Sequence, residues 1–353
     1  MTSLLLPGLL LLLLLAWPLY NVMLVSCMLT AGKPVRVAAR PAADLRYYWI
    51  VIPALNEEKV IANTVESALA LHALGTDVSV LVVDDASDDR TATILDGIQN
   101  SRLHVLRRQL PDARNGKGEA LNAAYNWIRS RAEIAGTVNS TIIGVIDGDG
   151  RGSDGLLEVV DALFDGRQVG AVQCRVRIHN RQRMLGLLQD IEFSCVANAS
   201  QVVRDLVDSV GMGGNGQFTR LAELARFGDR PWSRCLVEDL ERGLRLHLNG
   251  VRIRYSRSAT ITQQAVVDPK RLLRQRTRWA QGNLQCAGYL KQLLRSRQVG
   301  SIGLLDYLHY LVAPWLVVPM SILVGSTAVA TIVLVAMGSS VRLWRAVMSC
   351  SPH

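Results

Sequence analysis

The sequence has few aromatic residues and no closely paired cysteines. Phe, Trp and Tyr together make up 5% of its 353 residues, which argues against a protein that stacks nucleic-acid bases on aromatic side chains. The six cysteines are scattered and form no C-x-x-C pair, which argues against a zinc site or a disulfide framework. We therefore expect reduced cysteines that face the cytosol and no nucleic-acid partner.

The sequence also lacks the usual phosphate-binding loop. Around Lys117, the Gly-Lys-Gly segment has neither the spaced upstream glycine nor the following Ser or Thr of a Walker A loop. At the start of a predicted helix, its backbone N–H groups and ammonium can still meet anionic oxygen atoms. The first predicted strand, 47–54, is not followed by a glycine-rich basic loop either, and this argues against a nucleotidyltransferase.

Positive charge and an apolar N-terminal run are abundant. Lys and Arg number 39 against 30 Asp and Glu, a net charge of +9, which suits an anionic surface or substrate. Residues 4–29 are nearly all apolar, and a bilayer span needs only about 20 residues. No basic residue precedes the run, which disfavours a cleaved signal peptide and the lipoprotein cleavage box that residues 24–27 resemble. The following Lys33, Arg36 and Arg40 predict that the next segment is cytoplasmic.

A second apolar region, 302–339, contains two prolines and precedes a short tail. It indicates an interfacial helix with one span, or a single kinked span. The expected location is the cell membrane, with a multi-pass chain and a cytoplasmic main domain. The expected domains are a transmembrane helix in 1–32, a cytoplasmic domain in 41–300, interfacial or transmembrane helices in 301–340, and a tail in 341–353.

The clearest signal for a site follows an apolar run at 141–146. This β-branched run predicts a buried strand of a parallel sheet, and Asp147 and Asp149 follow it beside glycines. Open α/β sheets bind ligands at the carboxyl ends of their strands, and Mg²⁺ or Mn²⁺ takes one or two carboxylates together with phosphate oxygens. A solvated turn is the alternative, because Asp and Gly are ordinary turn residues. We hypothesise a metal–diphosphate site.

Carboxylates also follow the second predicted strand, 78–83. Asp84 and Asp85 can hold ribose hydroxyls or a base N–H there; an acidic helix N-cap is the alternative, but it does not require two acids at a strand end. A third strand, 103–107, leads to the Lys117 segment. Successive strands thus deliver acidic and basic residues to one edge of the predicted sheet, which is more informative than any single motif.

Three later segments resemble elements of a known family and occur along the chain in the order found in that family. Val237-Glu238-Asp239 is similar to a Thr-Glu-Asp element, residues 275–279 match a Q-x-x-R-W signature, and residues 213–217 resemble the acceptor segment before the Thr-Glu-Asp element. Residues 47–290 thereby resemble family-2 glycosyltransferases of the membrane-embedded processive type, which includes synthases of poly-N-acetylglucosamine, hyaluronan, chitin and cellulose. The resemblance implies the GT-A nucleotide-sugar fold, an α/β fold with a mostly parallel central sheet flanked by helices.

The resemblance also implies a role for each matching residue. Asp239 would be the general base, and Asp149 would bind Mg²⁺ or Mn²⁺. The residues that would contact the nucleotide-sugar are Asp84, Asp85, Lys117, Asp147, Gln275 and Arg278. Those that would contact the acceptor are Gly214, Asn215, Gln217, Glu238 and Trp279. Taken alone, the segment 237–245 would fit an exposed helix with early acids and late arginines, and Trp279 would fit a core or interface position.

The leading expectation is a membrane-bound, metal-dependent, inverting glycosyltransferase that adds sugar from a UDP-sugar to a growing polysaccharide through β-linkages. Two departures from the family matter: Val237 replaces Thr, and the C-terminal apolar region has room for only one or two spans. A homo-oligomer, a second membrane subunit or a lipid-linked acceptor would each account for the missing spans. A glycosyltransferase that modifies a membrane lipid is therefore the alternative, and a non-catalytic membrane-anchored binding protein is the second.

Overall fold

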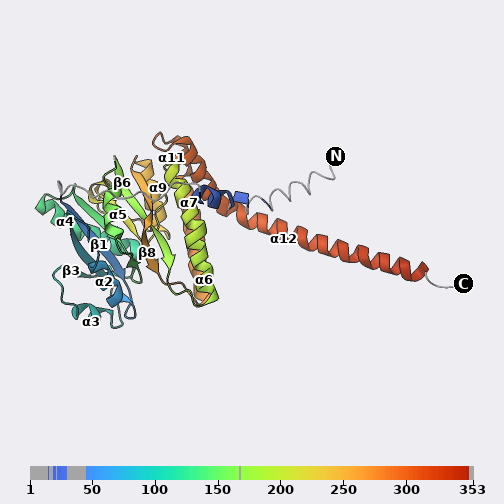
Figure 1. Ribbon diagram of the computed structural model, residues 1–353, viewed down its shortest axis with the longest axis horizontal. Helices are drawn as coiled ribbons and strands as arrows, with labels where there is room; N and C mark the ends of the chain where they lie inside the picture. The colour runs from blue at the N-terminus through green and yellow to red at the C-terminus, as the bar shows by residue number, and fades with distance from the viewer. Residues whose placement is uncertain (1–14, 16–18, 21, 30–44, 167, 350–353) are drawn as a thin grey trace.

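The computed structural model describes residues 15, 19–20, 22–29, 45–166 and 168–349. Most of them form one α/β domain around an eight-stranded sheet, from which a long C-terminal helix projects (Figure 1). The strand order is β3-β2-β1-β4-β7-β6-β8-β5. The strands are β1 (Arg46–Ala54), β2 (Thr76–Asp84), β3 (Leu103–Arg107), β4 (Thr141–Val145), β5 (Arg151–Gly152), β6 (Val169–Ile178), β7 (Gln217–Arg220) and β8 (Arg252–Gln263).

The sheet is mostly parallel, as expected. β1 lies between β2 and β4, and β2 also pairs with β3, all in parallel. β7 is antiparallel to both β4 and β6, while β6 and β8 are again parallel and β5 pairs antiparallel with β8. The four strands predicted from apolar runs agree with β1 to β4 to within two residues at each end, so that part of the prediction is confirmed.

Successive side chains of the central strands point to opposite faces of the sheet, and helices cover both faces. Ile50 and Ile52 pack into the core under α2, α3 and α5, whereas Val51 packs into the core under α4 and α8. The helices on the first face are α2 (Ile61–Leu69), α3 (Thr91–Asp96) and α5 (Leu156–Leu163). Those on the second face are α4 (Lys117–Ala135) and α8 (Leu221–Ala225).

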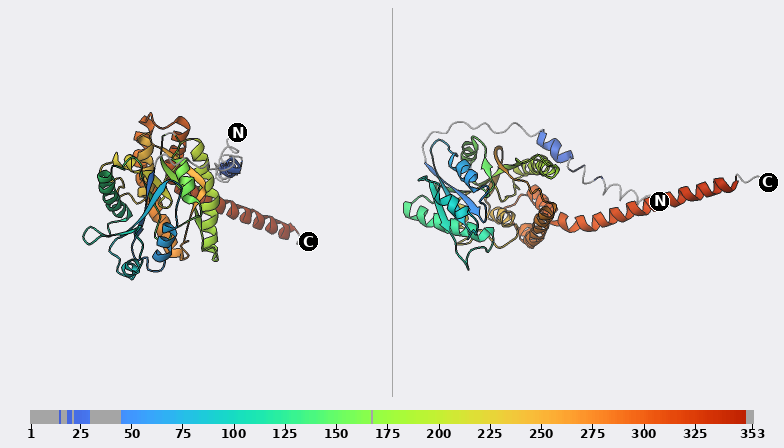
Figure 2. Two further views of the ribbon diagram at one scale, coloured as in Figure 1. Left: turned by 60° about the vertical axis from the view of Figure 1, so that its left-hand side comes forward. Right: turned by 90° about the horizontal axis from the view of Figure 1, so that it is seen from below.

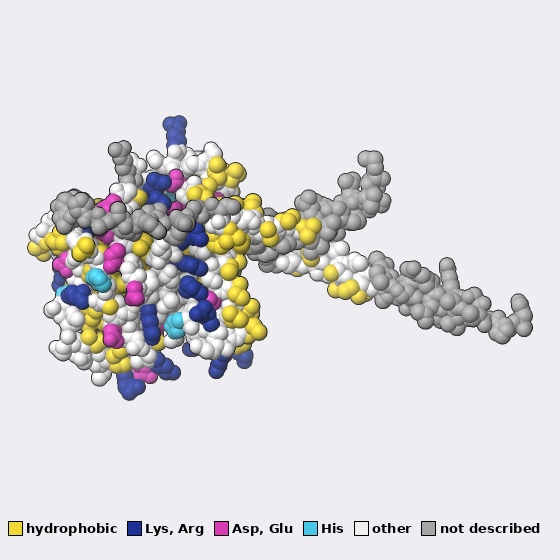
Figure 3. Space-filling view, viewed as in Figure 1, with side chains coloured by type: hydrophobic (Ala, Val, Ile, Leu, Met, Phe, Trp, Pro, Cys, Tyr) yellow, Lys and Arg dark blue, Asp and Glu magenta, His cyan; other side chains and the backbone are white. Residues whose placement is uncertain are grey.

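A rod of three helical segments runs along one side of the sheet. It consists of α6 (Met184–Ile191), the π-helix η1 (Glu192–Ala197) and α7 (Asn198–Leu206), which follow one another without a break. Hydrophobic side chains gather along the edge where α6 runs (Figure 3). The remaining helices of the domain are α9 (Glu238–Leu248), α10 (Pro269–Cys286), the 3₁₀ helix η2 (Ala287–Tyr289) and α11 (Leu290–Arg295).

The last helix, α12 (Ser301–Ser349), begins on the domain and then projects away from it (Figures 1 and 2). Its first turns bury Tyr307 and Leu311 against α9, α10 and α11. Asp306 accepts a hydrogen bond at 2.9 Å from Nε of Arg204 on α7, and the same guanidinium lies 4.6 Å from the ring centre of Tyr310. An ion pair and a ring contact therefore join α12 to α7.

The structure corrects the predicted membrane topology. Within the described ranges, no helix combines the length and the apolar character that a bilayer crossing requires. The expected multi-pass location in the cell membrane is therefore wrong for this part of the chain. The first turns of α12 pack against the domain. The predicted span at 4–29 falls largely outside the described residues.

Candidate active site

Two carboxylates follow β4 and a third lies beside them. Asp147 and Asp149 flank Gly148, where a Cβ atom would come within 2.9 Å of Cγ of Glu57, so a glycine is needed for this close approach. Burial, together with the charges of Asp149 and Asp147, raises the pKa of Glu57 to about 7. Burial also raises the pKa of Asp149, although the backbone N–H of Gln264 donates to its Oδ2 at 2.9 Å. The cluster thus holds more negative charge than its neighbours balance.

Lys117, the first residue of α4, reaches this cluster. Its ammonium donates to the Asp147 carboxylate and, at 3.0 Å, to the carbonyl oxygen of Gly214. Burial acts to lower the pKa of Lys117, but the charges of Asp147 and Glu238 outweigh it and the pKa rises. Lys117 therefore remains an ammonium at the end of β4, where an anionic ligand would meet it.

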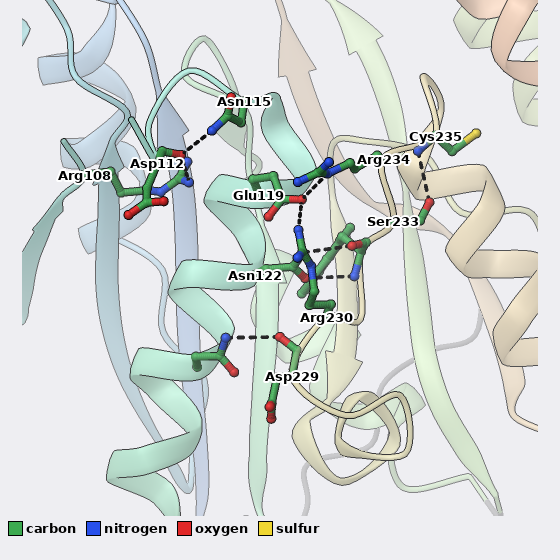
Figure 4. Close-up of polar contacts among 12 residues, drawn as sticks. Arg108, Asp112, Asn115, Glu119, Asn122, Asp229, Arg230, Ser233, Arg234 and Cys235 are labelled. Atoms are coloured by element: carbon green, nitrogen blue, oxygen red, sulfur yellow. Dashed lines mark hydrogen bonds and ion pairs between the residues drawn. The ribbon is translucent and has the colours of Figure 1, made fainter. Parts of the chain in front are cut away.

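Helix α4 also positions the loop before α9 (Figure 4). Asn122 donates to the carbonyl of Trp232 at 2.8 Å and accepts from the same residue's N–H at 3.0 Å. The Glu119 carboxylate binds the guanidinium groups of Arg230 and Arg234. At Gly118 a Cβ atom would lie 2.7 Å from a backbone oxygen of this loop. The close packing that the glycine allows brings the start of α9 next to Lys117.

Glu238 and Asp239 form the first turn of α9. Asp239 is half-buried, and its partial removal from water raises its pKa, while Lys117 acts in the opposite direction. Burial and the neighbouring charge of Asp239 raise the pKa of Glu238 to about 7. The preceding Val237 makes no side-chain cap and instead packs against Gly282 of α10, where a Cβ would lie 2.6 Å from Cγ1 of Val237.

Gly214, in the predicted acceptor segment, lies next to both Lys117 and Asp239. A Cβ atom there would lie 3.0 Å from Nζ of Lys117 and 3.3 Å from Oδ2 of Asp239. The neighbouring Asn215 is held by its own side chain, which accepts from the N–H of Asp147 at 3.2 Å and donates to Gln263 at 2.9 Å. These hydrogen bonds fix the path of the backbone around Asn215, between Asp147 and Asp239.

These residues open onto a single cavity of about 400 Å³. One part of its wall comes from η1 and α7, and another part comes from α10. The predicted residues that line it are Lys117, Asp147, Gly214, Asn215, Glu238, Asp239, Gln275, Arg278 and Trp279. Residues that the sequence did not suggest also line it, among them Phe193, Ala197, Gln201, Arg204 and Tyr310. The latter group comes from helices whose packing no motif reveals.

Four of the predicted residues lie outside this cavity lining: Asp84, Asp85, Asp149 and Gln217. Asp84 and Asp85 stand at the carboxyl end of β2, next to the end of β1. Asp85 forms an ion pair with Arg108 and accepts from the backbone N–H of Arg114 at 3.0 Å, so its carboxylate is engaged within the protein. Gln217 is buried in β7 and donates to the Gly214 carbonyl at 3.3 Å.

Arg242 is a residue of this region that sequence reasoning missed. It is 1% exposed, its ring contact with Trp232 measures 4.7 Å, and it donates to Thr219 at 3.2 Å. Two of its nitrogens, Nε and Nη2, have no hydrogen-bond partner in the described structure, and burial lowers its pKa to about 10. Its spacing in the sequence could have revealed it, because residue 242 follows Glu238 and Asp239 by about one helical turn and so lies on the same side of the helix.

The acidic cluster fits a divalent cation bound together with a ligand. The described residues contain no group of three or more His, Cys, Asp or Glu side chains arranged to hold a metal ion by themselves. Mg²⁺ requires only one or two carboxylates when phosphate oxygens and water complete its coordination. The raised pKa values of Glu57 and Asp149 show that positive charge would be favourable here.

Comparison with known proteins identifies the family. The model for "Glycosyltransferase like family 2" matches residues 46–282. The chain is a family-2 glycosyltransferase. This glycosyltransferase is 30% identical over 285 residues to a β-monoglucosyldiacylglycerol synthase of Nostoc sp. (strain PCC 7120), covering 77% of this chain and 56% of the relative. It is 32% identical over 241 residues to the Synechocystis sp. (strain PCC 6803) protein of that name, covering 67% and 47%.

Other relatives are more distant. The Staphylococcus aureus (strain COL) poly-β-1,6-N-acetyl-D-glucosamine synthase is 26% identical over 248 residues, covering 68% of this chain and 55% of the relative. The chain thus spans about half the length of the curated relatives it matches. The resemblance to the family is confirmed, whereas the expected membrane-embedded processive type stays a prediction.

Solved structures agree on the fold. The mannosyltransferase PcManGT from Pyrobaculum calidifontis, in complex with GDP-Man and Mn²⁺, superposes with a TM-score of 0.62 at 19% identity, covering 92% of this chain and 87% of that one. S. aureus TarS 1-349 in complex with UDP-GlcNAc gives 0.51 at 17% identity, covering 76% and 73%. The glycosyltransferase therefore has a GT-A-like α/β fold.

Proposed function

We propose that this glycosyltransferase transfers a sugar from a nucleotide-diphosphate sugar to the hydroxyl group of a lipid, with inversion at the sugar. The observation that carries the proposal is the cavity, whose lining combines Lys117, Asp147 and Asp239 with apolar side chains such as those of Phe193, Met212 and Trp279. Two of the relatives described above are named as synthases of a glucosylated diacylglycerol. This favours the lipid acceptor over the polysaccharide that the sequence first suggested.

The donor would lie at the Lys117 end of the cavity. Lys117 and Arg278 would contact the diphosphate and stabilise the charge that develops on it as the sugar leaves. Asp149 and Asp147 would hold a Mg²⁺ or Mn²⁺ ion, which would neutralise part of the same charge. We propose a UDP-sugar, the donor class that the sequence resemblance implies, with Asp84 and Asp85 toward the nucleoside.

The acceptor would approach from the other side of Gly214. Asp239 is the proposed general base, because it lines the cavity and its Oδ2 atom lies 3.3 Å from the position of a Cβ at Gly214. Its raised pKa suits a group that must take a proton from a hydroxyl. Glu238 and Trp279 would contact the acceptor. Single displacement needs no second nucleophilic carboxylate, so inversion follows.

Replacing the proposed base gives the sharpest test of this function. We expect Asp239→Asn to lower kcat by at least about a hundredfold, since general-base catalysis contributes that much or more. The measurement is transfer of radiolabelled sugar from UDP- and GDP-sugars, with Mg²⁺ or Mn²⁺, into solvent-extractable product with diacylglycerol as acceptor. Asp229→Asn is the control, because that side chain is 81% exposed and distant from the cavity lining.

Two results would contradict the proposal. Near wild-type turnover by Asp239→Asn would remove the assigned base. The second candidate function is polysaccharide synthesis, which the similarity to the poly-N-acetylglucosamine synthase supports. It would be favoured if the label accumulated in a water-soluble polymer of high molecular mass and none appeared in the lipid extract.

A further inference from the structure

An apolar ridge lies exposed on α6 and η1. Its side chains keep between 38% and 70% of their surface exposed, and they are Met184, Leu187, Leu188, Ile191 and Val196. Residues three or four apart share one face of an α-helix, and residues five apart hydrogen bond in a π-helix. The ridge is therefore continuous from Met184 through Ile191 to Val196.

The same rod presents a second face to the cavity. Phe193, Ala197, Gln201 and Arg204 line the cavity, and they follow one another at intervals of three or four residues. Phe193 stands between ridge residues Ile191 and Val196 in sequence and is half-buried. The ridge and the cavity wall are thus two faces of the same rod, and both include residues of η1.

The edge between ridge and cavity carries a paired charge. Glu192, at the start of η1, binds the guanidinium of Arg276 on α10 at 2.8 and 2.6 Å. This ion pair joins the two parts of the cavity wall and neutralises a carboxylate next to the ridge. The carboxylate that lies beside the ridge therefore has a charge partner.

We infer that the ridge on α6 and η1 holds a hydrocarbon chain of the acceptor lipid, while the hydroxyl-bearing end of that lipid lies in the cavity beside Asp239. The inference rests on the proposed function and adds the part of the substrate that lies outside the cavity. From Met184 to Val196 the ridge is about 18 Å long at 1.5 Å per residue. A lipid chain spans half of a hydrocarbon core of about 30 Å, or about 15 Å, so one chain fits along it.

Chain-length selectivity is the expected consequence. Each methylene group that leaves water on the ridge should improve apparent affinity by about fourfold at most. Wild-type enzyme should therefore show a lower KM for dipalmitoylglycerol than for dioctanoylglycerol, both presented at equal mole fraction in the same detergent micelles. The chemistry at Asp239 is the same for both acceptors, so kcat should differ little.

The test compares a ridge variant with a matched surface variant. In Leu188→Gln/Ile191→Gln we expect the KM for dipalmitoylglycerol to rise about tenfold, with kcat and the donor KM within about twofold of wild type. Both positions are half exposed, so the fold should tolerate the change. Ile134→Gln is the control, because that side chain is 89% exposed on α4 and away from the cavity lining. An unchanged KM in the ridge variant overturns the inference.

A binding measurement separates this inference from the proposed function. A diacylglycerol with a diazirine on its acyl chain should label peptides that contain residues 184–196, and the ridge variant should lose that label. Labelling without sugar transfer would support the ridge and refute the proposed catalysis. Transfer without labelling of these residues would refute the ridge alone. A ridge that is instead covered by a second copy would appear as a dimer that the double variant dissociates, which would also overturn the inference.

Discussion

The guanidinium of Arg242 lies buried about one turn beyond the two acids at the start of α9. Its charge interacts favourably with Asp239 and Glu238, while burial makes it easier to deprotonate. Its hydrogen bonding is incomplete, with one bond to Thr219 and two nitrogens without partners in the described structure. A buried, poorly satisfied cation costs stability, so we regard Arg242 as a residue that positions Asp239 and keeps it ionised.

Arg242→Met should change the pH dependence of catalysis. Without the cation the ionised form of Asp239 is less favourable, so the pKa of that carboxyl rises further. A general base works only when it is deprotonated, so on acidification the variant should lose activity at a higher pH than wild type does. We expect kcat/KM on the acidic limb to fall by about threefold or more, with a smaller change at the optimum.

The measurement is a kcat/KM profile from pH 5 to 9, with circular dichroism to verify folding. Arg245→Met is the control, because Arg245 lies on the same helix but contacts Phe227 and the carbonyl of Pro231. Superimposable profiles for the Arg242 variant and wild type would exclude the positioning role.

Residue types and strand ends placed Lys117 and Asp147 at one edge of the sheet, whereas the family resemblance singled out Asp239; all three line the cavity. The sequence could not show that Asp85 is paired with Arg108, or that Phe193 and Tyr310 line the cavity. Those contacts depend on how distant segments pack, and no local pattern encodes them. The assigned chemical roles remain predictions until the variants are measured.

Among the elements, β4 has a tight packing constraint. Gly144 lies at its centre, opposite Ile50 of β1 and Phe218 of β7. A Cβ atom on Gly144 would come within 2.4 Å of Cε1 of Phe218, whose side chain is fully buried. Strand β4 therefore combines a buried apolar run with a position where any side chain would displace the ring.

Gly144→Ala should destabilise the protein by about 1–3 kcal/mol, the usual cost of overpacking a core. Because Asp147 follows three residues later, we also expect a lower kcat. Urea unfolding monitored by fluorescence gives the first quantity and the transfer assay the second. Gly288→Ala is the control, because nothing lies within 4 Å of a Cβ there. Equal unfolding midpoints for the Gly144 variant and wild type would refute the packing argument.

Strands β1, β2 and β4 were predictable because their β-branched runs are largely buried on both faces. The insertion of β7 between β4 and β6 was not, because β7 has only four residues and its partners are distant in sequence. The rod of α6, η1 and α7 was missed for a different reason. Its exposed apolar residues resemble core residues in composition, and only the structure shows that they face outward.

At the scale of the whole molecule, the attachment of α12 to the domain can be tested through the ion pair between Asp306 and Arg204. Asp306 and Arg204 are only 18% and 14% exposed, and Ser209 also donates to Asp306 at 3.0 Å. Asp306→Asn would leave the Arg204 cation without its charge partner. We expect the free energy of unfolding to fall by about 3 kcal/mol, the lower range for breaking a buried pair.

Urea titration measures that loss, and hydrogen exchange over residues 301–311 would show whether the start of α12 loosens. Asp208→Asn is the matched control, because its pair with Arg252 is 61% and 44% exposed and such surface pairs contribute about 0–1 kcal/mol. Equal losses in the two variants would show that the α12 contact is no stronger than a surface pair.

The contacts of α4 have a mechanical consequence for the reaction cycle. One rigid helix carries Lys117 at its tip and, through Asn122, the loop that leads to Asp239 (Figure 4). The residue proposed to stabilise the leaving group and the residue proposed to accept the proton are therefore both held by α4. We therefore expect any opening that admits substrate or frees product to occur between η1 and α10, where the ion pair between Glu192 and Arg276 would have to break.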